Sequence, residues 1–191
     1  MDGEGARRRS RVPEPRWLDD GEQLSWRRYL LGAALLHERI DRDLQERHDL
    51  SAAEYEVLVR LSEAPDRSIR MAELAEVCNQ SRSRLSHTVD RLQRDGLVAR
   101  HTCDADRRGV WASLTAAGLG RLEEAARTHV AGVREYFVDA ASAEDFATVG
   151  RVFQAVVDRL APESPGLGSL RAETADPPAG QTASTKTPQP R

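Results

Sequence analysis

The stretch of residues 69–115 constrains the fold of this chain more than any other. It runs in order through a short strand, two short helices, a glycine, a strand, a charged turn and a returning strand. Apolar residues recur at helical spacing, at Met71, Leu74, Ala75 and Cys78 in the first helix and at Leu85, Val89 and Leu92 in the second. This order of elements is that of a winged helix-turn-helix. The expected fold class is therefore mainly α with a small β-hairpin wing.

The ends of the two helices follow from residues with known backbone preferences. Asn79 tolerates the left-handed conformation and can end the first helix. Ser81 or Ser83 can cap the second helix by accepting its first free backbone N–H groups. Gly96 follows the last apolar position and stops that helix. Because only a tight turn separates the helices, they must cross rather than stack antiparallel.

The positions away from the apolar stripe make the second helix a candidate for entry into a DNA groove. Short hydroxyl side chains let a backbone approach DNA, and arginine can bind guanine bidentately or pair with phosphate. The residues expected nearest the bases are Ser81, Arg82, Ser83, Arg84, Ser86 and His87. Arg91 and Arg94 are expected to contact phosphates. The alternative is an ordinary solvated helix face, which carries the same residue types.

The wing is the second part of the pattern. Residues 97–103 and 110–114 carry apolar, β-branched or aromatic side chains at alternating positions, which predicts two strands. Their connection, residues 104–109, is polar and ends in Gly109, which can adopt positive φ. Arg107 or Arg108 is expected to reach an adjacent minor groove, with Asp106 as the residue that orients it. The alternative is a solvated turn with a surface salt bridge.

Three runs of residues make this region resemble the MarR family of bacterial transcription regulators. They are Arg91-Leu92 with Asp95-Gly96-Leu97-Val98, then Asp106-Arg107-Arg108, then Leu114-Thr115-Ala116-Ala117-Gly118. The specific motif is confined to residues 69–118, and the similarity extends in outline over residues 17–160. The resemblance implies a homodimer with interlocked terminal helices, which places one winged helix-turn-helix on each half of a pseudo-palindromic operator. Many members of the family release DNA when a small anionic or phenolic ligand binds.

Long amphipathic segments flank the winged region on both sides. Residues 22–46 form a helical pattern that is apolar on more than one side, and residues 115–137 and 142–160 form two more. A capping box at Ser51 and Glu54 opens a further helix, which Pro65 ends. Because the winged core is closed by its own helices, the long helices need another surface, and self-association supplies one. Packing within one chain is the alternative.

The expected organisation is one MarR-like domain, residues 17–161, between two disordered ends. The winged helix-turn-helix is expected over about residues 51–114 and the dimerisation helices over about 17–48 and 115–161. The arginine-rich residues 1–16 are predicted to be a disordered arm, with a DNA-contacting basic arm as the alternative. Residues 162–191, rich in Pro, Gly, Thr and Ser, are predicted to be a disordered tail. With no apolar run of membrane-spanning length and no signal-peptide pattern, a cytoplasmic protein is expected.

The charge of the chain has no overall basic signature. Its formal net charge is −3, whereas residues 70–111 hold eight arginines against six acidic residues, a net of +2. Since the position of charge matters more than its sum, specific binding is expected to rely on a dimer and on individually placed arginines. The expected partners are double-stranded DNA and a second copy of the chain, with a small-molecule effector as a candidate and no membrane.

The two cysteines and five histidines form no catalytic or metal-binding pattern. Cys78 is predicted to be a small core residue, and Cys103 beside His101 leaves a thiol sensor or a metal site as minor alternatives. The chain has no phosphate-binding glycine loop, nucleophile elbow or HExxH pattern, so neither an enzyme nor a cofactor is expected. The remaining alternative is a winged-helix scaffold or anti-repressor that has lost DNA binding.

An effector, if the chain has one, is expected where the first helix and the helix of residues 115–137 meet the winged domain. The residues considered for lining such a site are Trp17, Trp26, Tyr29, His37 and Tyr55. Each of them has an alternative role in the core of the domain or of the dimer. DNA binding is expected to repress a promoter by occluding it, with activation as the alternative.

Overall fold

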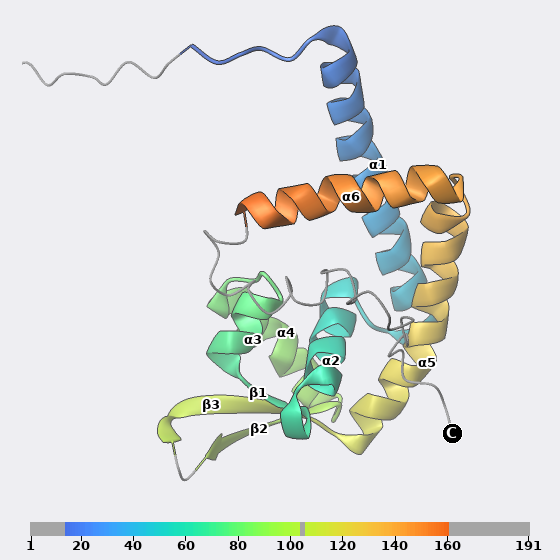
Figure 1. Ribbon diagram of the computed structural model, residues 1–191. Helices are drawn as coiled ribbons and strands as arrows, with labels where there is room; N and C mark the ends of the chain where they lie inside the picture. Colours follow the sequence, from blue (N-terminus) through green and yellow to red (C-terminus); the bar gives the residue numbers. More distant parts are fainter. Residues whose placement is uncertain (1–13, 104–105, 161–191) are drawn as a thin grey trace, which may run out of the picture. The chain divides into compact units, whose positions relative to one another are not determined.

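The computed structural model describes residues 14–103 and 106–160 of the 191-residue chain. Its helices are α1 Asp20–His48, α2 Ala52–Glu63, α3 Met71–Val77, α4 Arg82–Arg94, α5 Ala116–Val133 and α6 Ala143–Leu160. Its strands are β1 Ser68–Arg70, β2 Val98–Cys103 and β3 Asp106–Leu114. A 3₁₀ turn, Pro65–Arg67, precedes β1, and a π-helical segment, Arg134–Val138, follows α5. The predicted fold class, mainly α with a small sheet, is confirmed (Figure 1).

The chain divides into two compact units, residues 1–35 and 36–191, and α1 contributes to both. In the first unit α1 starts with a reciprocal cap. The Glu22 N–H donates to Asp19 Oδ1 at 2.8 Å, and the Asp19 N–H donates to Glu22 Oε2 at 3.0 Å. This cap begins the helix at Asp20, two residues before the start that the apolar pattern predicts.

The three strands form an antiparallel sheet in the order β1-β3-β2. Strand β1 pairs from Ser68 opposite Ser113 to Arg70 opposite Trp111. Strand β2 pairs with the other edge of β3, beginning with Val98 opposite Leu114. Within the second unit, this narrow sheet lies at one end of α2, α3 and α4, and the β2–β3 hairpin extends beyond them (Figure 1).

The apolar core of the second unit holds the helix-turn-helix in place. The largest fully buried leucines are Leu44, Leu50, Leu58, Leu61, Leu74, Leu85, Leu92 and Leu122. Each buried leucine contributes about 1.5–3 kcal/mol relative to an exposed one. The predicted inward positions Leu74 and Ala75 of α3, Cys78 just after it, and Leu85, Val89 and Leu92 of α4 are all in the core, and Met71 is partly buried against it. One side of α4 is therefore committed to the core.

The predicted ends of these helices are confirmed. Asn79 has a φ of 48° and Gly96 a φ of 72°, so both adopt the left-handed conformation that ends a helix. Ser81, not Ser83, is the N-cap of α4, because its Oγ accepts from the Arg84 N–H at 3.2 Å. The capping box of α2 is also present: Glu54 accepts from the Ser51 N–H at 2.8 Å, and its own N–H donates to Ser51 Oγ at 3.3 Å.

The helix expected over residues 115–137 is not regular to its end. Its last part, Arg134–Val138, is π-helical. There the Tyr136 hydroxyl donates to Oδ2 of the buried Asp43 at 3.0 Å, and Arg39 pairs with Asp43 Oδ1 at 3.1 Å. A single π turn re-aims the side chains that follow a regular helix. This contact with α1 joins residues far apart in sequence, so helical periodicity does not predict it.

Two apolar surfaces stay exposed in the described chain. One is the apolar face of α6, where Val152, Phe153, Val156 and Leu160 are 41–56% exposed. The other belongs to residues 14–35 and includes Trp17, Leu18, Trp26, Leu30 and Leu31. No helix in the described residues is long and apolar enough to cross a bilayer.

Candidate nucleic-acid interface

The N-terminal half of α4 carries exposed polar and basic residues on the side away from the core. Of the predicted DNA-contacting residues, those exposed to solvent are Ser81, Arg82, Ser83, Arg84, His87 and Arg94. Within the described residues, no hydrogen bond or ion pair engages the guanidinium groups of Arg82, Arg84 or Arg94. Because the opposite side of α4 is packed into the core, these cations are presented on a helix of fixed position.

Ser86 lies at the edge of this face, next to the wing. Arg100 of β2 donates through Nη2 to the Ser86 carbonyl oxygen at 2.9 Å and lies 3.5 Å from its Oγ. The Nη1 group of Arg100 forms an ion pair with the Asp90 carboxylate. Sequence reasoning does not single out Arg100, and the only available signal is an arginine in a strand that packs beside α4. It ties the helix to the wing.

Arg91, predicted to contact a phosphate, has protein partners that the sequence does not predict. Its Nε lies 3.1 Å from Glu54 Oε1, and its Nη2 lies 3.1 Å from Asp49 Oδ1. The guanidinium is half-buried and bound to the junction between α1 and α2. The sequence assigns this residue to a phosphate, whereas two of its nitrogens already have protein partners.

Strand β3 begins earlier than the alternating pattern predicts. The predicted polar connection runs to Gly109, but β3 starts at Asp106, which pairs with Cys103 beyond a register shift after Thr102. Backbone pairing does not require apolar side chains, so alternation misses such an extension. Residues 104–105 and the side chains of residues 103–108 lie outside the described residues. The roles predicted for Asp106, Arg107 and Arg108, and the sensor alternative for Cys103, remain predictions.

Polar and aromatic side chains line the sheet at the base of the wing. Ser68 Oγ lies 2.9 Å from Ser113 Oγ, which lies 3.3 Å from Nδ1 of His101. Two positions further along the same strands, the Arg70 guanidinium lies 5.4 Å from the centre of the Trp111 ring, a cation–π arrangement. These contacts connect all three strands, so they hold the hairpin to the body of the helix-turn-helix.

Comparison with known proteins agrees with this winged helix-turn-helix arrangement. The family model described as MarR family matches residues 48–109, from the end of α1 into the wing. The solved structure of Sco3205 from Streptomyces coelicolor, a MarR family transcriptional regulator in complex with DNA, is 41% identical with a TM-score of 0.73. The similarity covers 78% of this chain and 93% of Sco3205. The chain belongs to the MarR family of transcription regulators.

Two further relatives agree with this assignment. AbsC, a MarR family transcriptional regulator from Streptomyces coelicolor, is 39% identical with a TM-score of 0.72, over 78% of this chain and 99% of AbsC. The HTH-type transcriptional repressor YetL of Bacillus subtilis is 31% identical over 93 residues, which is 47% of this chain. The chain spans only 56% of the length of YetL. The family resemblance of residues 69–118 is thereby confirmed.

The five residues predicted to line an effector site in this MarR-family chain belong to both units. Trp17, Trp26 and Tyr29 belong to the first unit and are exposed, with the Trp26 and Tyr29 rings 5.4 Å apart. His37 is an exposed residue of α1 in the second unit. Tyr55 of α2 is half-buried and stacks on His129 of α5 at 4.7 Å. Tyr55 therefore takes part in packing α2 on α5.

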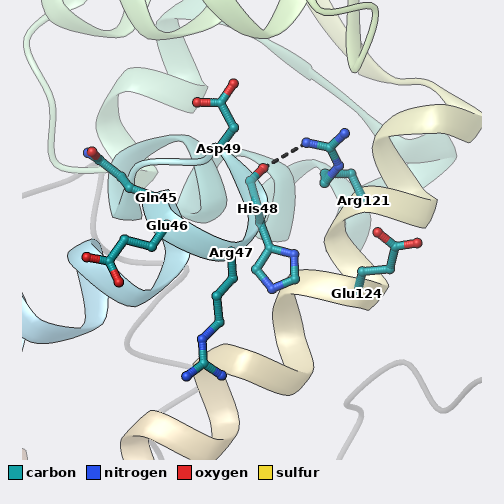
Figure 2. A pocket seen from close by; sticks show the side chains of 7 residues that line it. All are labelled: Gln45, Glu46, Arg47, His48, Asp49, Arg121 and Glu124. Atoms are coloured by element: carbon teal, nitrogen blue, oxygen red, sulfur yellow. Dashed lines mark hydrogen bonds between the residues drawn. The ribbon is translucent and has the colours of Figure 1, made fainter.

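A polar hollow of about 340 Å³ lies instead beside the C-terminal end of α1. Its lining is Gln45, Glu46, Arg47, His48, Asp49, Arg121 and Glu124 (Figure 2). The hollow lies between α1 and α5, in the region predicted for an effector, but none of the five predicted residues lines it. Arg121 of α5 donates through Nη1 to the His48 carbonyl at 2.8 Å, and His48 Nε2 lies 2.7 Å from Thr128 Oγ1.

Burial determines the protonation of the Cys78 thiol. Burial raises the pKa of the Cys78 thiol to about 12, with the nearby Glu56 carboxylate acting in the same direction. The thiol is therefore protonated at neutral pH, and the predicted core role of Cys78 is confirmed. Among the residues that the structure describes, no group of three or more His, Cys, Asp or Glu side chains is arranged to hold a metal ion.

Proposed function

We propose that this chain is a sequence-specific DNA-binding transcription repressor and not an enzyme. The observation that carries the proposal is the exposed N-terminal half of α4, where Arg82, Arg84 and His87 face solvent on a winged helix-turn-helix. Arginine can read guanine in the major groove or neutralise phosphate. The DNA complex of the relative Sco3205 and the description of the relative YetL as a repressor support the same function.

In this proposal α4 enters the major groove. Ser81, Arg82, Ser83, Arg84 and His87 contact bases, with Ser86 at the edge of the contact, and Arg94 contacts a phosphate. Arg107 or Arg108 enters the neighbouring minor groove, and Asp106 orients the arginine. The formal net charge of −3 does not oppose this, because the contacts depend on where the arginines lie.

The functional form is proposed to be a homodimer on a pseudo-palindromic operator. The exposed apolar face of α6, with Val152, Phe153 and Val156, supports self-association, because monomers rarely leave large contiguous apolar patches in water. A two-fold dimer places its two α4 helices on half-sites about one helical turn apart. Sedimentation should therefore give a dimer at micromolar concentration, and a stable monomer would contradict this part of the proposal.

Release of DNA by a small polar effector completes the proposal. The hollow beside His48 and Arg121 supports it, because cationic and anionic side chains line it next to the α1–α2 junction. An effector bound in the hollow would favour one conformation of the α1–α2 junction over another. Candidate compounds should raise the melting temperature and lower DNA affinity together. A compound that raises the melting temperature without lowering DNA affinity binds the protein but does not regulate it.

The decisive test is selection of bound duplexes from random DNA, followed by titration of the selected duplex at two salt concentrations. The expected result is an inverted repeat bound well above random DNA. Arg82→Ala with Arg84→Ala should abolish the preference, whereas Arg127→Ala, an exposed arginine of α5, should leave it unchanged. Weak, sequence-blind binding by the wild type would instead favour the alternative of a winged-helix interaction scaffold.

A further inference from the structure

The junction between α1 and α2, residues 48–54, is held by side chains from two other helices. α1 ends at His48, and Asp49 adopts a φ of 51°, a conformation that a residue other than glycine rarely adopts. Leu50 is buried, and Ser51 caps α2. We call this segment the α1–α2 corner. Its backbone turns sharply, so the conformation of the corner depends on the groups that bind it.

Two arginines bind consecutive carbonyl oxygens of this corner. Arg121 of α5 donates through Nη1 to the His48 carbonyl at 2.8 Å (Figure 2). Arg91 of α4 donates through Nη2 to the Asp49 carbonyl at 3.2 Å and to the Asp49 carboxylate at 3.1 Å. The last carbonyls of a helix have no partner within the helix and attract cations. The end of α1 is therefore bound simultaneously by α5 and by α4.

Glu54 completes the link on the α2 side. It is 3% exposed, and its Oε2 accepts from the N–H and the Oγ of Ser51 at 2.8 and 2.7 Å. Its Oε1 lies 3.1 Å from Nε of Arg91. A buried carboxylate needs both hydrogen bonds and a counter-charge, and Arg91 supplies the counter-charge. The same glutamate thus caps α2 and fixes a residue of the DNA-reading helix.

We propose that Arg91 is a positioning residue that sets the position and orientation of α4 through the α1–α2 corner, and that Arg121 holds the corner from α5. Displacement of α5 or of the end of α1 is then transmitted to α4 through two arginines and one short segment. This inference rests on the proposed DNA-binding function. It differs from a phosphate-contact role for Arg91 in that the effect on DNA requires Glu54, which is buried.

The first test compares Arg91→Gln, Glu54→Gln and the double variant with the wild type on the selected duplex. Glutamine at position 54 keeps an oxygen for capping Ser51 and removes the charge and the acceptor that face Arg91. Each single variant should bind DNA about tenfold more weakly, within the usual range of coupling between sites. The double variant should lose no more, because both substitutions break the same pair. Each should retain the wild-type dependence of affinity on salt.

A phosphate contact gives a different result. If Arg91 touches DNA, Arg91→Gln should reduce the slope of log affinity against log salt by about 0.9 for each phosphate that is no longer neutralised, and Glu54→Gln should bind normally. That outcome would overturn the positioning role. Arg94→Gln, which removes an exposed arginine three residues further along α4, is the matched control and should reduce the slope.

The second test examines α5 and also works without DNA. Arg121→Gln should weaken DNA binding with an unchanged salt slope and should not add to Arg91→Gln, whereas Arg127→Gln should have no effect. In the free protein, Arg121→Gln and Arg91→Gln should each raise amide exchange in α4 while β2 and β3 keep their protection. Unchanged exchange in α4 would overturn transmission through the corner. If the wild type selects no duplex, the DNA-binding function fails, and the exchange result alone decides the role of the corner.

Discussion

At the scale of single residues, the arginines around α4 divide into those that hold the helix and those that it offers to a partner. Arg100 and Arg91 bind Asp90, Glu54 and other groups of the protein. Arg82 and Arg84 are exposed, and no described residue binds their guanidinium groups. Residue type does not separate the two sets, since all four are arginines within one short region. Their partners do.

Arg100→Gln should lower the free energy of unfolding by about 1–3 kcal/mol, because the Asp90 carboxylate and the Ser86 carbonyl lose a charged donor. Urea unfolding followed by circular dichroism would measure the change. Asp90→Asn should cost less, since the bond to the Ser86 carbonyl remains. Arg94→Gln serves as the control and should stay within about 0.5 kcal/mol of the wild type. Equal stability of the Arg100 and Arg94 variants would contradict the assignment.

At the scale of elements, close approaches decide how the helices join the sheet. The start of α5 passes so near the base of the β2–β3 hairpin that a Cβ on Gly118 would lie 2.1 Å from the Leu97 carbonyl oxygen and 2.8 Å from Leu114 Cδ1. Thr115 caps α5 by accepting from the Gly118 N–H at 2.9 Å, and its hydroxyl donates to the Gly96 carbonyl at 2.8 Å. Glycine at position 118 is thus required by the approach.

Gly118→Ala and Gly120→Ala test this approach with the same substitution two residues apart. Gly118→Ala should lower the free energy of unfolding by about 1–3 kcal/mol, because backbone must move to accept the methyl group. At Gly120 an added Cβ meets nothing within 4 Å. Alanine there should stabilise α5 by up to about 1 kcal/mol through helix propensity. Thermal unfolding of both variants checks the prediction, and a neutral Gly118→Ala would refute it.

The packing of α2 on α5 should make the fold sensitive to acid. Burial lowers the pKa of His129, which stacks on Tyr55, so the folded protein holds this imidazole neutral. The unfolded chain gains the proton first, as the pH falls below its ordinary value of 6.5. Stability is therefore complete above that pH and declines as the pH falls toward the lowered pKa of the folded state.

His129→Phe should reduce this acid sensitivity, because phenylalanine keeps an aromatic ring against Tyr55 and does not titrate. Denaturant midpoints measured from neutral pH into the acid range would show it as a flatter profile. His87→Gln removes an exposed imidazole of α4 and serves as the control. A profile for His129→Phe that runs parallel to the wild type would show that another group controls the acid response.

At the scale of the whole molecule, the described chain leaves apolar surface that its own core does not cover. No residue of α6 is buried, although its apolar positions recur at regular helical spacing. An amphipathic helix with an uncovered apolar face is stable when another surface covers it. A second copy of the chain is the surface that the proposed function requires.

Val156→Asp should weaken the dimer by about tenfold to hundredfold, because a charge would have to enter an apolar contact. Sedimentation over a range of concentrations would measure the association. Ala155→Asp introduces the same residue away from the apolar face, as helical spacing places it, and should leave the dimer intact. Equal effects of the two substitutions would show that α6 is not the contact.

Much of the fold follows from patterns within a few residues of chain. The stripes of α3 and α4, the left-handed Asn79 and Gly96, and the capping box at Ser51 are local preferences, and each is confirmed. The exposed face of α4 follows from the same spacing, because the positions left over by the buried stripe must point outward. The family motif in residues 69–118 is local as well. For these features the sequence is sufficient.

Other features depend on which elements meet. The partners of Arg91 and Arg100, the π turn beside Asp43 and the extension of β3 to Asp106 each join residues that local patterns treat separately. By itself the sequence determined which segments form helices and strands and which of their sides are polar, because those properties repeat with the geometry of the backbone. Only the tertiary structure decided which arginines are bound to other groups of the protein. An ion pair depends on the distance between two elements, and the spacing of residues within one element does not predict that distance.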